Sequence, residues 1–491
     1  MLLSRNNLDA IKVPGVIKPG AEIFDLPEKV LQFGTGVLLR GLPDYFIDKA
    51  NRQGLFNGRV VVVKSTDGGD GTAFDRQDGL YTLCVRGIEE GKKKQENIIH
   101  SAISRVLSAK SQWQEILQCA HNPAMQVIIS NTTEVGISLV EEDIHQQPPA
   151  SFPGKLLAFL YERYKVCKGS AGGGMVIVPT ELIVDNGKKL AAIVEKLAVY
   201  NKLEEDFISW LRSACRWCSS LVDRIVPGKP DTKTLQQLEH ELGYTDDLLS
   251  ISEVYRLWAI EGDERVRAVL SFAAADAGVV IAPDIEIFRE LKLRLLNGTH
   301  TLSCGLGYLA GFTTVKQAMD DAAFAGYVTD LMLKEIAPAI PYEIPATQSR
   351  DFGLQVLDRF RNPHLQHQWI SITMQYTSKM KMRNVPVLLQ HYKQHAAPPA
   401  LLSLGFAAYL LFMRGGNYTI NDDKAGVFTA VWAAHDAAGV VDTVLSDVSL
   451  WDTDLTQLPG FAAAVKENLE TLINKGVQAT LAQSGKLKKA L

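Results

Sequence analysis

The sequence predicts an α/β N-terminal domain with a mostly parallel sheet, followed by a mainly α-helical C-terminal domain. Three observations support this prediction. Short β-branched runs alternate with helical patterns in the first half of the chain, and a Gly-x-Gly turn follows the first strand. The second half contains long helical patterns and few β-branched runs. Strands that alternate with helices indicate βαβ units, which build parallel sheets.

The strands of the N-terminal half are short and apolar. The four valines at 60–63 are typical of a strand that is buried on both faces. Strands are predicted at 29–33, 60–63, 125–130 and 175–178. Helices are predicted at 38–50, 112–119 and 155–164. Pro43 lies inside the first of these helices, where it is best tolerated in a first turn.

The helical half begins after Pro283. Beyond this point, apolar residues recur at helical spacing in several long segments. These segments are 291–309, 314–335, 365–377, 401–414 and 461–475. We therefore expect an α/β domain at 1–283 and a helical domain at 284–491.

Composition excludes several classes of protein. The chain has 491 residues, of which 46% are hydrophobic and 22% charged, a profile typical of globular proteins and not of disordered ones. Six cysteines are too few for a disulfide-stapled scaffold. The formal charge, 51 − 55 = −4, does not indicate a nucleic-acid partner.

Targeting signals are not evident in the sequence. The start of the chain lacks the continuous apolar stretch of a secretion signal. The longest apolar run, 401–413, is shorter than the roughly 20 residues that cross a bilayer. We therefore predict a soluble cytoplasmic protein with reduced thiols and no membrane association. The sequence favours neither a monomer nor a homo-oligomer.

The turn Gly34-Thr35-Gly36 is the first candidate binding site. A strand, a Gly-x-Gly turn and a helix let backbone amides approach a pyrophosphate, as in Rossmann-like domains. Leu39 replaces the third glycine of that fingerprint, so a turn without a ligand is the alternative. The second strand ends at Lys64, where NAD-binding domains usually carry an acidic residue. Lys64 would suit the 2′-phosphate of NADP, whereas Asp67 and Asp70 follow it, so both cofactors stay open.

A second candidate group is Lys292, Asn297 and His300, in a predicted helix. A lysine can act as general acid or base, and Asn and His can orient a substrate oxygen. On an ideal α-helix, His300 lies within about a quarter-turn of each of the other two. Lys292 and Asn297 are more widely separated. The alternative is a surface lysine, a capping asparagine and a buried histidine.

Two further motifs carry polar residues. Asn131-Thr132-Thr133-Glu134 follows an apolar strand, at the kind of edge where parallel sheets bind ligands, although a simple turn is equally compatible. Cys215 and Cys218 have the spacing of a redox pair or half a zinc site. No second pair accompanies them, so we interpret them as two buried thiols and predict no metal site. Hydrolase and P-loop motifs are absent.

Several segments together resemble the long-chain, zinc-independent dehydrogenases of the mannitol dehydrogenase family. The resemblance covers nearly the whole chain, from about Val30 to Lys475. It is carried by Gln-Phe-Gly-Thr-Gly-Val-Leu-Leu-Arg at 32–40, Gln-Asp-Gly-Leu-Tyr-Thr at 77–82, Ser-Asn-Thr-Thr-Glu at 130–134, Glu-Leu-Ile-Val-Asp-Asn-Gly at 181–187, Leu-Val-Asp-Arg-Ile at 221–225, the lysine-to-histidine segment at 292–300, Arg-Phe-Arg-Asn-Pro at 359–363 and Asp-Leu-Thr-Gln-Leu-Pro at 454–459.

The resemblance implies a Rossmann-like domain and a helical domain with the active site between them. It implies that Lys292 is the catalytic acid/base, that Asn297 and His300 bind the reacting oxygen, and that no metal takes part. It also implies that Asp223 lies near the substrate. The residues expected to bind the cofactor are Gly34, Thr35, Gly36, Val37, Arg40, Lys64, Asn131, Thr132 and Glu134.

One departure from the family bears on the substrate. Polyol-oxidising members have Cys-Asp-Asn-Leu where this chain has Thr-Glu-Leu-Ile at 180–183, and the Asn of that motif helps to stabilise the substrate oxygen. Glu181 or Asn186 would take a related role here. The Glu-Leu-Ile-x-x-Asn-Gly form resembles the branch of the family that acts on tagaturonate. A uronate needs a cation for its carboxylate, and Lys381 and Arg383 in the helical half are the candidates.

The expected function is therefore the reversible, NADH-dependent reduction of a small hexuronate, D-tagaturonate, to D-altronate, with NADP as the alternative cofactor. Fructuronate reduction and the oxidation of a polyol of the mannitol type are alternatives with the same chemistry. A more remote alternative is a non-catalytic protein that senses a dinucleotide. Such a protein would not need Lys292, Asn297 and His300 together.

Overall fold

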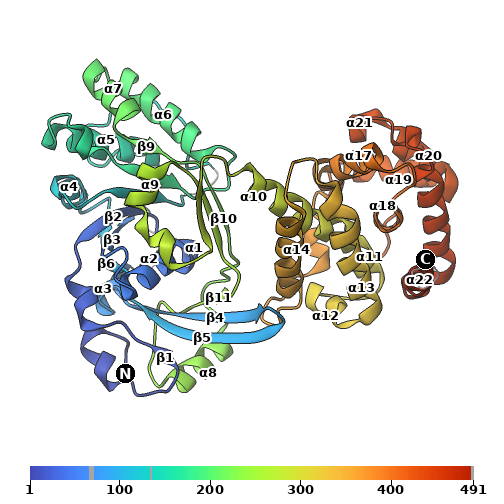
Figure 1. Ribbon diagram of the computed structural model, residues 1–491, viewed down its shortest axis with the longest axis horizontal. Coiled ribbons are helices and arrows are strands. Elements are labelled where there is room, and N and C mark those ends of the chain that lie inside the picture. The colour runs from blue at the N-terminus through green and yellow to red at the C-terminus, as the bar shows by residue number, and fades with distance from the viewer. Residues whose placement is uncertain (66–70, 133–134, 488–491) are drawn as a thin grey trace. The chain divides into compact units, whose positions relative to one another are not determined.

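The computed structural model describes residues 1–65, 71–132 and 135–487, which form two compact units (Figure 1). The first unit consists of Met1–Gly87 and Lys93–Ile285, and the second of Ile88–Lys92 and Glu286–Leu491. The three sheets belong essentially to the first unit, and the second is largely helical. The predicted fold class, an α/β half followed by a mainly helical half, is confirmed.

Parallel strands form the main sheet of the first unit, in the order β6-β3-β2-β7-β8-β9. Their bounds are Glu28–Phe33 (β2), Arg59–Lys64 (β3), Ile103–Ser108 (β6), Val127–Ser130 (β7), Val176–Pro179 (β8) and Arg216–Trp217 (β9). Counted along the chain within this sheet, the order is 3-2-1-4-5-6, which is the order of a doubly wound dinucleotide-binding sheet. The order reverses between β2 and β7, where such sheets bind their ligands.

Helices cover both faces of this sheet. Val61 and Val63 of β3 pack into a core with α4–α7, while Val60 and Val62 pack on the opposite face with α1 and α2. Because successive side chains of a strand point to opposite faces and both faces are covered, all four residues at 60–63 are apolar. The helices are Val37–Gly41 (α1), Pro43–Arg52 (α2), Trp113–Gln118 (α4), Phe152–Val166 (α5), Asn186–Tyr200 (α6) and Glu205–Ser213 (α7).

Two smaller sheets complete the first unit. One has the order β1-β5-β4-β11, and the other has the order β10-β12-β13. The pattern does not predict β5, because it opens with three consecutive lysines. The remaining elements are Val16–Ile17 (β1), Gly71–Arg76 (α3), Tyr81–Glu89 (β4), Lys92–His100 (β5), Ser220–Asp223 (β10), Thr232–Leu242 (α8), Ser250–Glu253 (β11), Leu257–Glu261 (β12), Glu264–Val269 (α9) and Val279–Ala282 (β13).

The helix predicted at 38–50 is two helices instead of one. Leu42 leaves the helical conformation, with φ −133° and ψ −75°, between α1 and α2. Pro43 then occupies the start of α2. A proline has no N–H to donate and its ring clashes with the preceding turn, so the chain restarts a helix there instead of continuing one.

The second unit contains the helices that follow Ile285. The predictions at 401–414 and 461–475 correspond to α18 and to the first part of α22. The helices are Glu286–Leu291 (α10), Thr299–Leu309 (α11), Val315–Asp320 (α12), Ala322–Asp330 (α13), Ala346–Phe360 (α14), Trp369–Ile372 (α15), Tyr376–Lys379 (α16), Val385–Gln394 (α17), Ala400–Met413 (α18), Ala425–Ala434 (α19), Ala437–Ser446 (α20), Val448–Trp451 (α21) and Phe461–Leu487 (α22).

Two predicted helices of this unit are wrong in extent. The segment 365–377 contains only the short α15 and the start of α16, because Gln375 adopts a left-handed conformation with φ 51°. The segment 314–335 breaks at Asp321, whose side chain instead caps the start of α13 by accepting a hydrogen bond from the amide of Phe324.

Three stretches of the second unit are π-helical and continue from α-helices without a break. They are Lys292–Gly298 (η6), Leu331–Ile336 (η7) and Met380–Asn384 (η9). In a π-helix each amide bonds to the carbonyl five residues earlier, so one residue more fits into the turn. Such turns occur frequently at functional sites, and two of these three contain residues that the sequence singles out.

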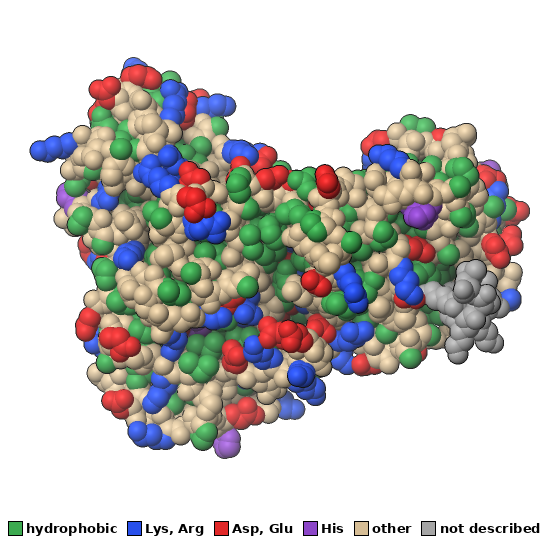
Figure 2. Space-filling model, viewed as in Figure 1, with side chains coloured by type: hydrophobic (Ala, Val, Ile, Leu, Met, Phe, Trp, Pro, Cys, Tyr) green, Lys and Arg blue, Asp and Glu red, His purple; other side chains and the backbone are tan. Residues whose placement is uncertain are grey.

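Charges of both signs are mixed on the face of the molecule that Figure 2 shows. On the face shown in Figure 2, lysine and arginine side chains are interspersed with aspartate and glutamate. None of the helices in the described ranges is long and apolar enough to cross a membrane.

Candidate active site

The glycine turn after β2 requires a residue without a side chain at its first position. Gly34 has φ 125°, which L-residues rarely adopt. A Cβ atom on Gly34 would lie 2.9 Å from the carbonyl oxygen of Asn131 and 2.9 Å from a methyl of Leu39. The amide of Gly34 donates to the carbonyl of Val63 at 3.0 Å. The end of β2 therefore packs directly against the end of β7.

The next two amides of the turn are available to a ligand. The carbonyl of Gly34 accepts a hydrogen bond from Gln32 Nε2 at 3.4 Å, and in a trans peptide the following N–H points the opposite way. The amide of Thr35 is thus directed away from Gln32. Neither Thr35 nor Gly36 donates a backbone hydrogen bond to another described residue, and a Cβ on Gly36 would meet no atom within 4 Å. Successive amides of this kind bind phosphate oxygens.

The end of β7 is held by the carboxylate of Glu181. Thr132 donates to Glu181 Oε1 from its amide at 2.9 Å and from its hydroxyl at 3.0 Å, and Ser130 Oγ donates to Oε2 at 3.1 Å. Asn131 Nδ2 donates to Thr180 Oγ1 at 2.9 Å. Glu181 is only 3% exposed, so its two oxygens fix the loop that follows β7. Glu134 lies outside the described residues.

Asn186 is occupied by backbone groups. Its Nδ2 donates to the carbonyls of Pro179, Glu181 and Ser220, at 3.1, 3.0 and 3.1 Å. Its Oδ1 accepts hydrogen bonds from the amides of Ser220 and Gly187, both at 2.9 Å. Asn186 therefore holds the start of α6 against β8 and β10.

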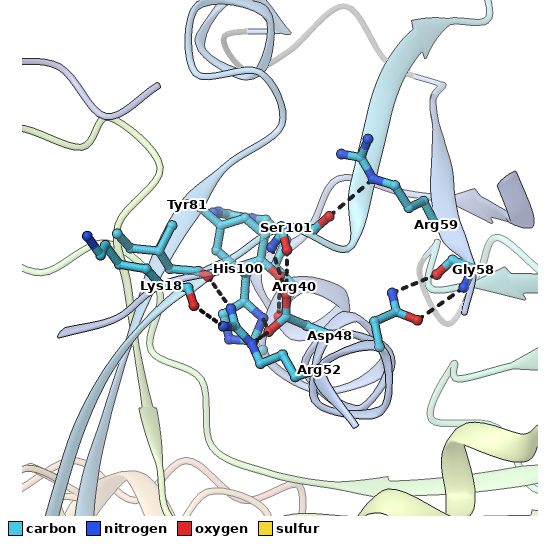
Figure 3. A network of polar contacts seen from close by, with 12 residues as sticks. Lys18, Arg40, Asp48, Arg52, Gly58, Arg59, Tyr81, His100 and Ser101 are labelled. Carbon is cyan, nitrogen blue, oxygen red and sulfur yellow. Dashed lines mark hydrogen bonds and ion pairs between the residues drawn. The ribbon is translucent and has the colours of Figure 1, made fainter. Parts of the chain in front are cut away.

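The other cofactor candidates of the first unit lie at the ends of strands or in the core. Arg40 is 7% exposed and donates from Nη1 to the carbonyl of Leu248 at 2.5 Å. Figure 3 shows Arg40 next to Tyr81, whose ring centroid is 5.3 Å from its guanidinium. The Lys64 side chain reaches α3, with Nζ 3.4 Å from where a Cβ on Gly71 would lie. Asp67 and Asp70 lie outside the described residues.

Val37 and Asp223 also belong to the first unit. The side chain of Val37 lies 3.1 Å from where a Cβ on Gly228 would be, so the loop containing Gly228 packs against the start of α1. Asp223 ends β10 and is 6% exposed. The next residue, Arg224, stacks its guanidinium 4.4 Å from the ring centroid of Tyr45.

The π-helix η6 brings Lys292 and Asn297 to the same face. On an ideal α-helix, residues five apart differ by about 140° around the axis. In a π-helix, with roughly 4.4 residues per turn, the same spacing differs by only about 50°. His300, near the start of α11, follows Asn297 by three residues and falls on the same side. The wide separation expected for the ideal helix does not apply, because η6 is not α-helical.

His300 is a buried, neutral histidine. Its ring stacks on Phe360, with ring centroids 4.0 Å apart and planes 6° apart, and it meets the edge of His367 at 5.1 Å. Burial lowers the pKa of His300 well below its usual value, and the nearby His367, Arg359 and Arg383 lower it further. Its Nε2 is buried without a hydrogen-bond partner among the described residues. The neutral ring can therefore donate a hydrogen bond to a substrate oxygen through an N–H group, but it is not the charged acid that protonates that oxygen.

Arg383 of η9 lies beside this face, whereas Lys381 does not. Arg383 Nη1 donates to Thr301 Oγ1 at 3.0 Å and to the carbonyl of Asn297 at 3.5 Å. Its Nε is buried and has no partner within the described part of the chain. Lys381 instead donates to Asp452 Oδ1 at 2.7 Å, and Asp452 is 78% exposed. The structure thus separates the two cations that the sequence grouped together.

Two π-helices are tied to each other by Arg294. Its Nη1 donates to the carbonyls of Met382 and Arg383, at 2.6 and 2.9 Å. Glu290 accepts from its Nε at 2.9 Å and balances its charge. Arg294 therefore sets the position of η9, and with it Arg383, relative to η6.

Comparisons with known proteins identify the family of the chain. The mannitol dehydrogenase Rossmann domain matches residues 28–272, and the mannitol dehydrogenase C-terminal domain matches residues 284–473. Altronate oxidoreductase of Bacillus subtilis is 38% identical over 462 residues, which cover 93% of this chain and 95% of that protein. The chain belongs to the mannitol dehydrogenase family. Altronate oxidoreductase of Pectobacterium carotovorum is 36% identical over 473 residues, covering 93% and 96%.

Solved structures show the same mannitol dehydrogenase fold. A D-sorbitol dehydrogenase matches with a TM-score of 0.79 at 21% identity, covering 98% of this chain and 100% of that one. Mannitol 2-dehydrogenase of Pseudomonas fluorescens, solved with NAD and D-mannitol, matches with a TM-score of 0.67 at 22% identity, covering 99% and 100%.

Sequence reasoning missed several residues of this family member that surround the candidate groups. Phe360 and His367 pack on His300, Thr301 binds Arg383, and Arg294 joins η6 to η9. Phe360 lies inside the family segment 359–363, which was a usable signal. Arg294 and Thr301 meet Arg383 only because the chain returns at η9, and His367 reaches His300 from the segment before α15. These are tertiary contacts that no local pattern marks.

The cysteine interpretation is confirmed. Cys215 and Cys218 are free, buried thiols, and burial raises the pKa of each to about 12. A thiol with such a pKa is inert as a nucleophile or ligand at neutral pH. In the described ranges, no group of three or more His, Cys, Asp or Glu residues is arranged to hold a metal ion.

Proposed function

We propose that this member of the mannitol dehydrogenase family is an NAD-dependent oxidoreductase that reduces D-tagaturonate to D-altronate, reversibly and without a metal. The observation that carries the proposal is the π-helical conformation of η6, which by its angular spacing turns Lys292 to the side of Asn297 and His300, next to Arg383, which contacts Asn297 and Thr301. The similarity to altronate oxidoreductases at 36–38% identity supports the choice of substrate. We assign cofactor binding to residues 1–283 and substrate chemistry to residues 284–491.

The first unit fits a dinucleotide. The amides of Thr35 and Gly36 would bind its pyrophosphate, with Gly34 required for the turn and Val37 and Arg40 supporting it from α1. Asn131, Thr132 and Glu134 follow the neighbouring strand β7 and would face the nicotinamide part. NADH supplies the hydride when bound. We propose NAD over NADP because Lys64 interacts with other groups of the chain and is not a free cation for a 2′-phosphate.

Lys292 is the group that supplies the proton. Of the three residues on the common face, Asn297 has no titratable proton, and burial leaves His300 neutral. The ammonium of Lys292 can donate a proton to the carbonyl oxygen of the substrate as that oxygen gains charge. Asn297 and His300 hold the same oxygen by hydrogen bonds, which stabilises the charge that develops. In the reverse direction, neutral Lys292 takes the hydroxyl proton.

Arg383 is the proposed partner of the substrate carboxylate. Its Nη1 is committed to Thr301 and Asn297, but its buried Nε has no partner in the described residues. The edge formed by Nε and the second amino group of a guanidinium binds a carboxylate through two parallel hydrogen bonds. We also propose that Asp223 lies near the substrate. Glu181 would act on the substrate indirectly, by holding the loop that follows β7. Lys381, bonded to Asp452, keeps at most an indirect role.

We infer that the enzyme works in the cytoplasm on a free, small-molecule hexuronate. Its six cysteines all carry free thiols, as expected in a reducing compartment. Binding of a nucleic acid or of a membrane forms no part of the proposal.

The proposal is tested by initial rates of NADH oxidation with D-tagaturonate, D-fructuronate and D-fructose, measured in parallel on chelator-treated enzyme. NADPH serves as the second donor. We expect the highest kcat/KM with tagaturonate and NADH, unchanged by the chelator. A preference for fructuronate or fructose would overturn the substrate assignment and keep the chemistry. NADH binding without turnover of any keto compound would overturn the assignment as an enzyme.

A further inference from the structure

A buried acid–amide pair lies directly behind the glycine turn. Asp44, in the first turn of α2, and Gln32, in β2, are both 0% exposed. Gln32 Nε2 donates to Asp44 Oδ2 at 3.3 Å and to the carbonyl of Gly34 at 3.4 Å. Both partners of Nε2 are acceptors, so the orientation of the Gln32 amide is fixed, and both of its N–H groups are used.

Two oxygens of this pair are left without a donor. Gln32 Oε1 and Asp44 Oδ1 are buried and have no hydrogen-bond partner in the described ranges. A carboxylate and an amide oxygen are both acceptors, so neither can serve the other while Asp44 is ionised. A buried acceptor without a donor costs about 1–3 kcal/mol, and more when it is charged. A proton on Asp44 Oδ1 would supply the donor that is missing, because an amide and a carboxylic acid already joined by one N–H···O bond can form a second bond from the acid O–H to the amide oxygen.

We propose that Asp44 is held as a neutral carboxylic acid, which closes a ring of two hydrogen bonds with Gln32 and thereby fixes the carbonyl of Gly34. Because the amide of Thr35 points away from that carbonyl, the ring sets the direction of the first amide offered to the cofactor. Asp44 is then a positioning residue for cofactor binding, and this role rests on the cofactor site proposed above.

The surroundings of Asp44 favour the neutral form. Burial raises its pKa to about 7, against the bond from Gln32 and the charge of Arg40 on α1, which lower it, while Asp48 raises it further. Tyr81 on β4 is a neutral neighbour, because burial raises its pKa well above its usual value.

Asp48, one turn further along α2, is a buried carboxyl group that is well supplied with hydrogen-bond donors. It accepts hydrogen bonds from Arg52 Nε at 2.6 Å, from the amide of Ser101 at 2.8 Å and from Ser101 Oγ at 3.0 Å (Figure 3). Burial raises the pKa of Asp48, but the interactions with His100 and Arg52 and the hydrogen bonds from Arg52 and Ser101 bring it below its usual value. The pKa values of two carboxyl groups on one helix are therefore shifted in opposite directions, and Asp44, next to the glycine turn, has an oxygen without a donor in the described residues.

The test is the dissociation constant of NADH, measured by fluorescence on the full-length protein between about pH 6 and pH 9. If only the protonated form binds well, a group with a pKa of about 7 weakens binding by roughly 30-fold at pH 8.5. Asp44→Asn keeps the ring, because its amide donates to Gln32 Oε1 at every pH. We expect this variant to bind NADH as the wild type does near pH 6 and to lose the pH dependence.

Asp48→Asn is the matched control on the same helix, and we expect it to keep the wild-type pH profile. Gln32→Leu removes the bond to Gly34 and should weaken NADH binding at every pH, including near pH 6. Equal pH profiles for the wild type and Asp44→Asn, or weak binding by Asp44→Asn at all pH values, would overturn the inference.

A measurement without cofactor separates this inference from the proposed function. In protein labelled with ¹³C at the aspartate carboxyls, we expect one resonance that titrates near neutral pH and moves in Gln32→Leu. If every aspartate carboxyl titrates near the ordinary value of about 4 or below, the neutral acid is refuted, whether or not Asp44→Asn folds. A protein that shows the resonance but binds no NADH at any pH would refute the cofactor site and not the acid–amide ring.

Discussion

Replacing Arg383 with methionine removes the proposed partner of the substrate carboxylate while keeping most of the side-chain volume. Arg383 Nε is buried without a partner among the described residues, and Nη1 is the group that holds Thr301 and Asn297. Hydrogen bonds to charged groups contribute about 1.5–3 kcal/mol. At 1.4 kcal/mol for each factor of ten, KM for tagaturonate should rise about 10- to 150-fold.

Lys381→Met is the matched control, because it removes a cation two residues away in the same π-helix. Lys381 pairs with the largely exposed Asp452, and exposed ion pairs contribute about 0–1 kcal/mol. Its KM for tagaturonate should therefore change by less than about fivefold. The assay is steady-state NADH oxidation with tagaturonate varied at saturating NADH, and then with NADH varied.

The assignment of Arg383 requires that its loss affects the uronate and not the dinucleotide. Equal increases of KM for tagaturonate and NADH would refute it, as would a larger effect of Lys381→Met than of Arg383→Met. Arg383→Lys adds a further check. A lysine keeps the charge but loses the paired donors, so its KM should fall between those of the wild type and the methionine variant.

Four further substitutions have defined outcomes. Lys292→Ala should lower kcat by about 10²–10⁴-fold in stopped-flow assays without a matching loss of NADH affinity, and near-normal turnover would exclude Lys292 as the acid. Gly34→Ala should lower the free energy of unfolding in urea by about 1–3 kcal/mol, because its methyl group meets Asn131 and Leu39. Gly36→Ala should change that free energy by less than about 0.5 kcal/mol, because its methyl group meets no atom, yet it should weaken NADH binding. The pKa of Asp44 is raised in the folded state, so its stabilising contribution is complete below about pH 4 and is lost as pH rises towards 7. The free energy of unfolding of Asp44→Asn, measured with urea, should therefore rise relative to that of the wild type by up to about 4 kcal/mol between pH 4 and pH 8. A difference that stays constant with pH would contradict the raised pKa.

The fold was predictable where local pattern and burial agree. The valines at 60–63 indicated a strand covered on both faces, and both faces are indeed covered by helices. The helix at 38–50 was predicted without its break, because a proline at a first helical position is compatible with one helix or two. The helix prediction at 365–377 was wrong because Gln375 adopts a left-handed conformation, which sequence patterns predict only at residues such as glycine or asparagine.

The candidate residues could be named from the sequence, but their geometry could not. Spacing alone left Lys292, Asn297 and His300 open, and the family resemblance made them the candidates. No residue propensity distinguishes a π-turn from an α-turn. The difference between Arg383 and Lys381 depends on η9 packing against η6 through Arg294, which is a tertiary contact. The pairing of Gln32 with Asp44 likewise joins a strand to a helix across a turn, and only coordinates show it.

The most direct test of the account is to follow the hydride. Chelator-treated enzyme is given D-tagaturonate with NADH deuterated at the transferable position, and the sugar acid formed is examined by mass spectrometry and NMR. The account predicts D-altronate with one deuterium on the carbon that was the ketone, and no such product from Lys292→Ala within the same time. Altronate without deuterium, or no altronate from tagaturonate at all, would contradict it.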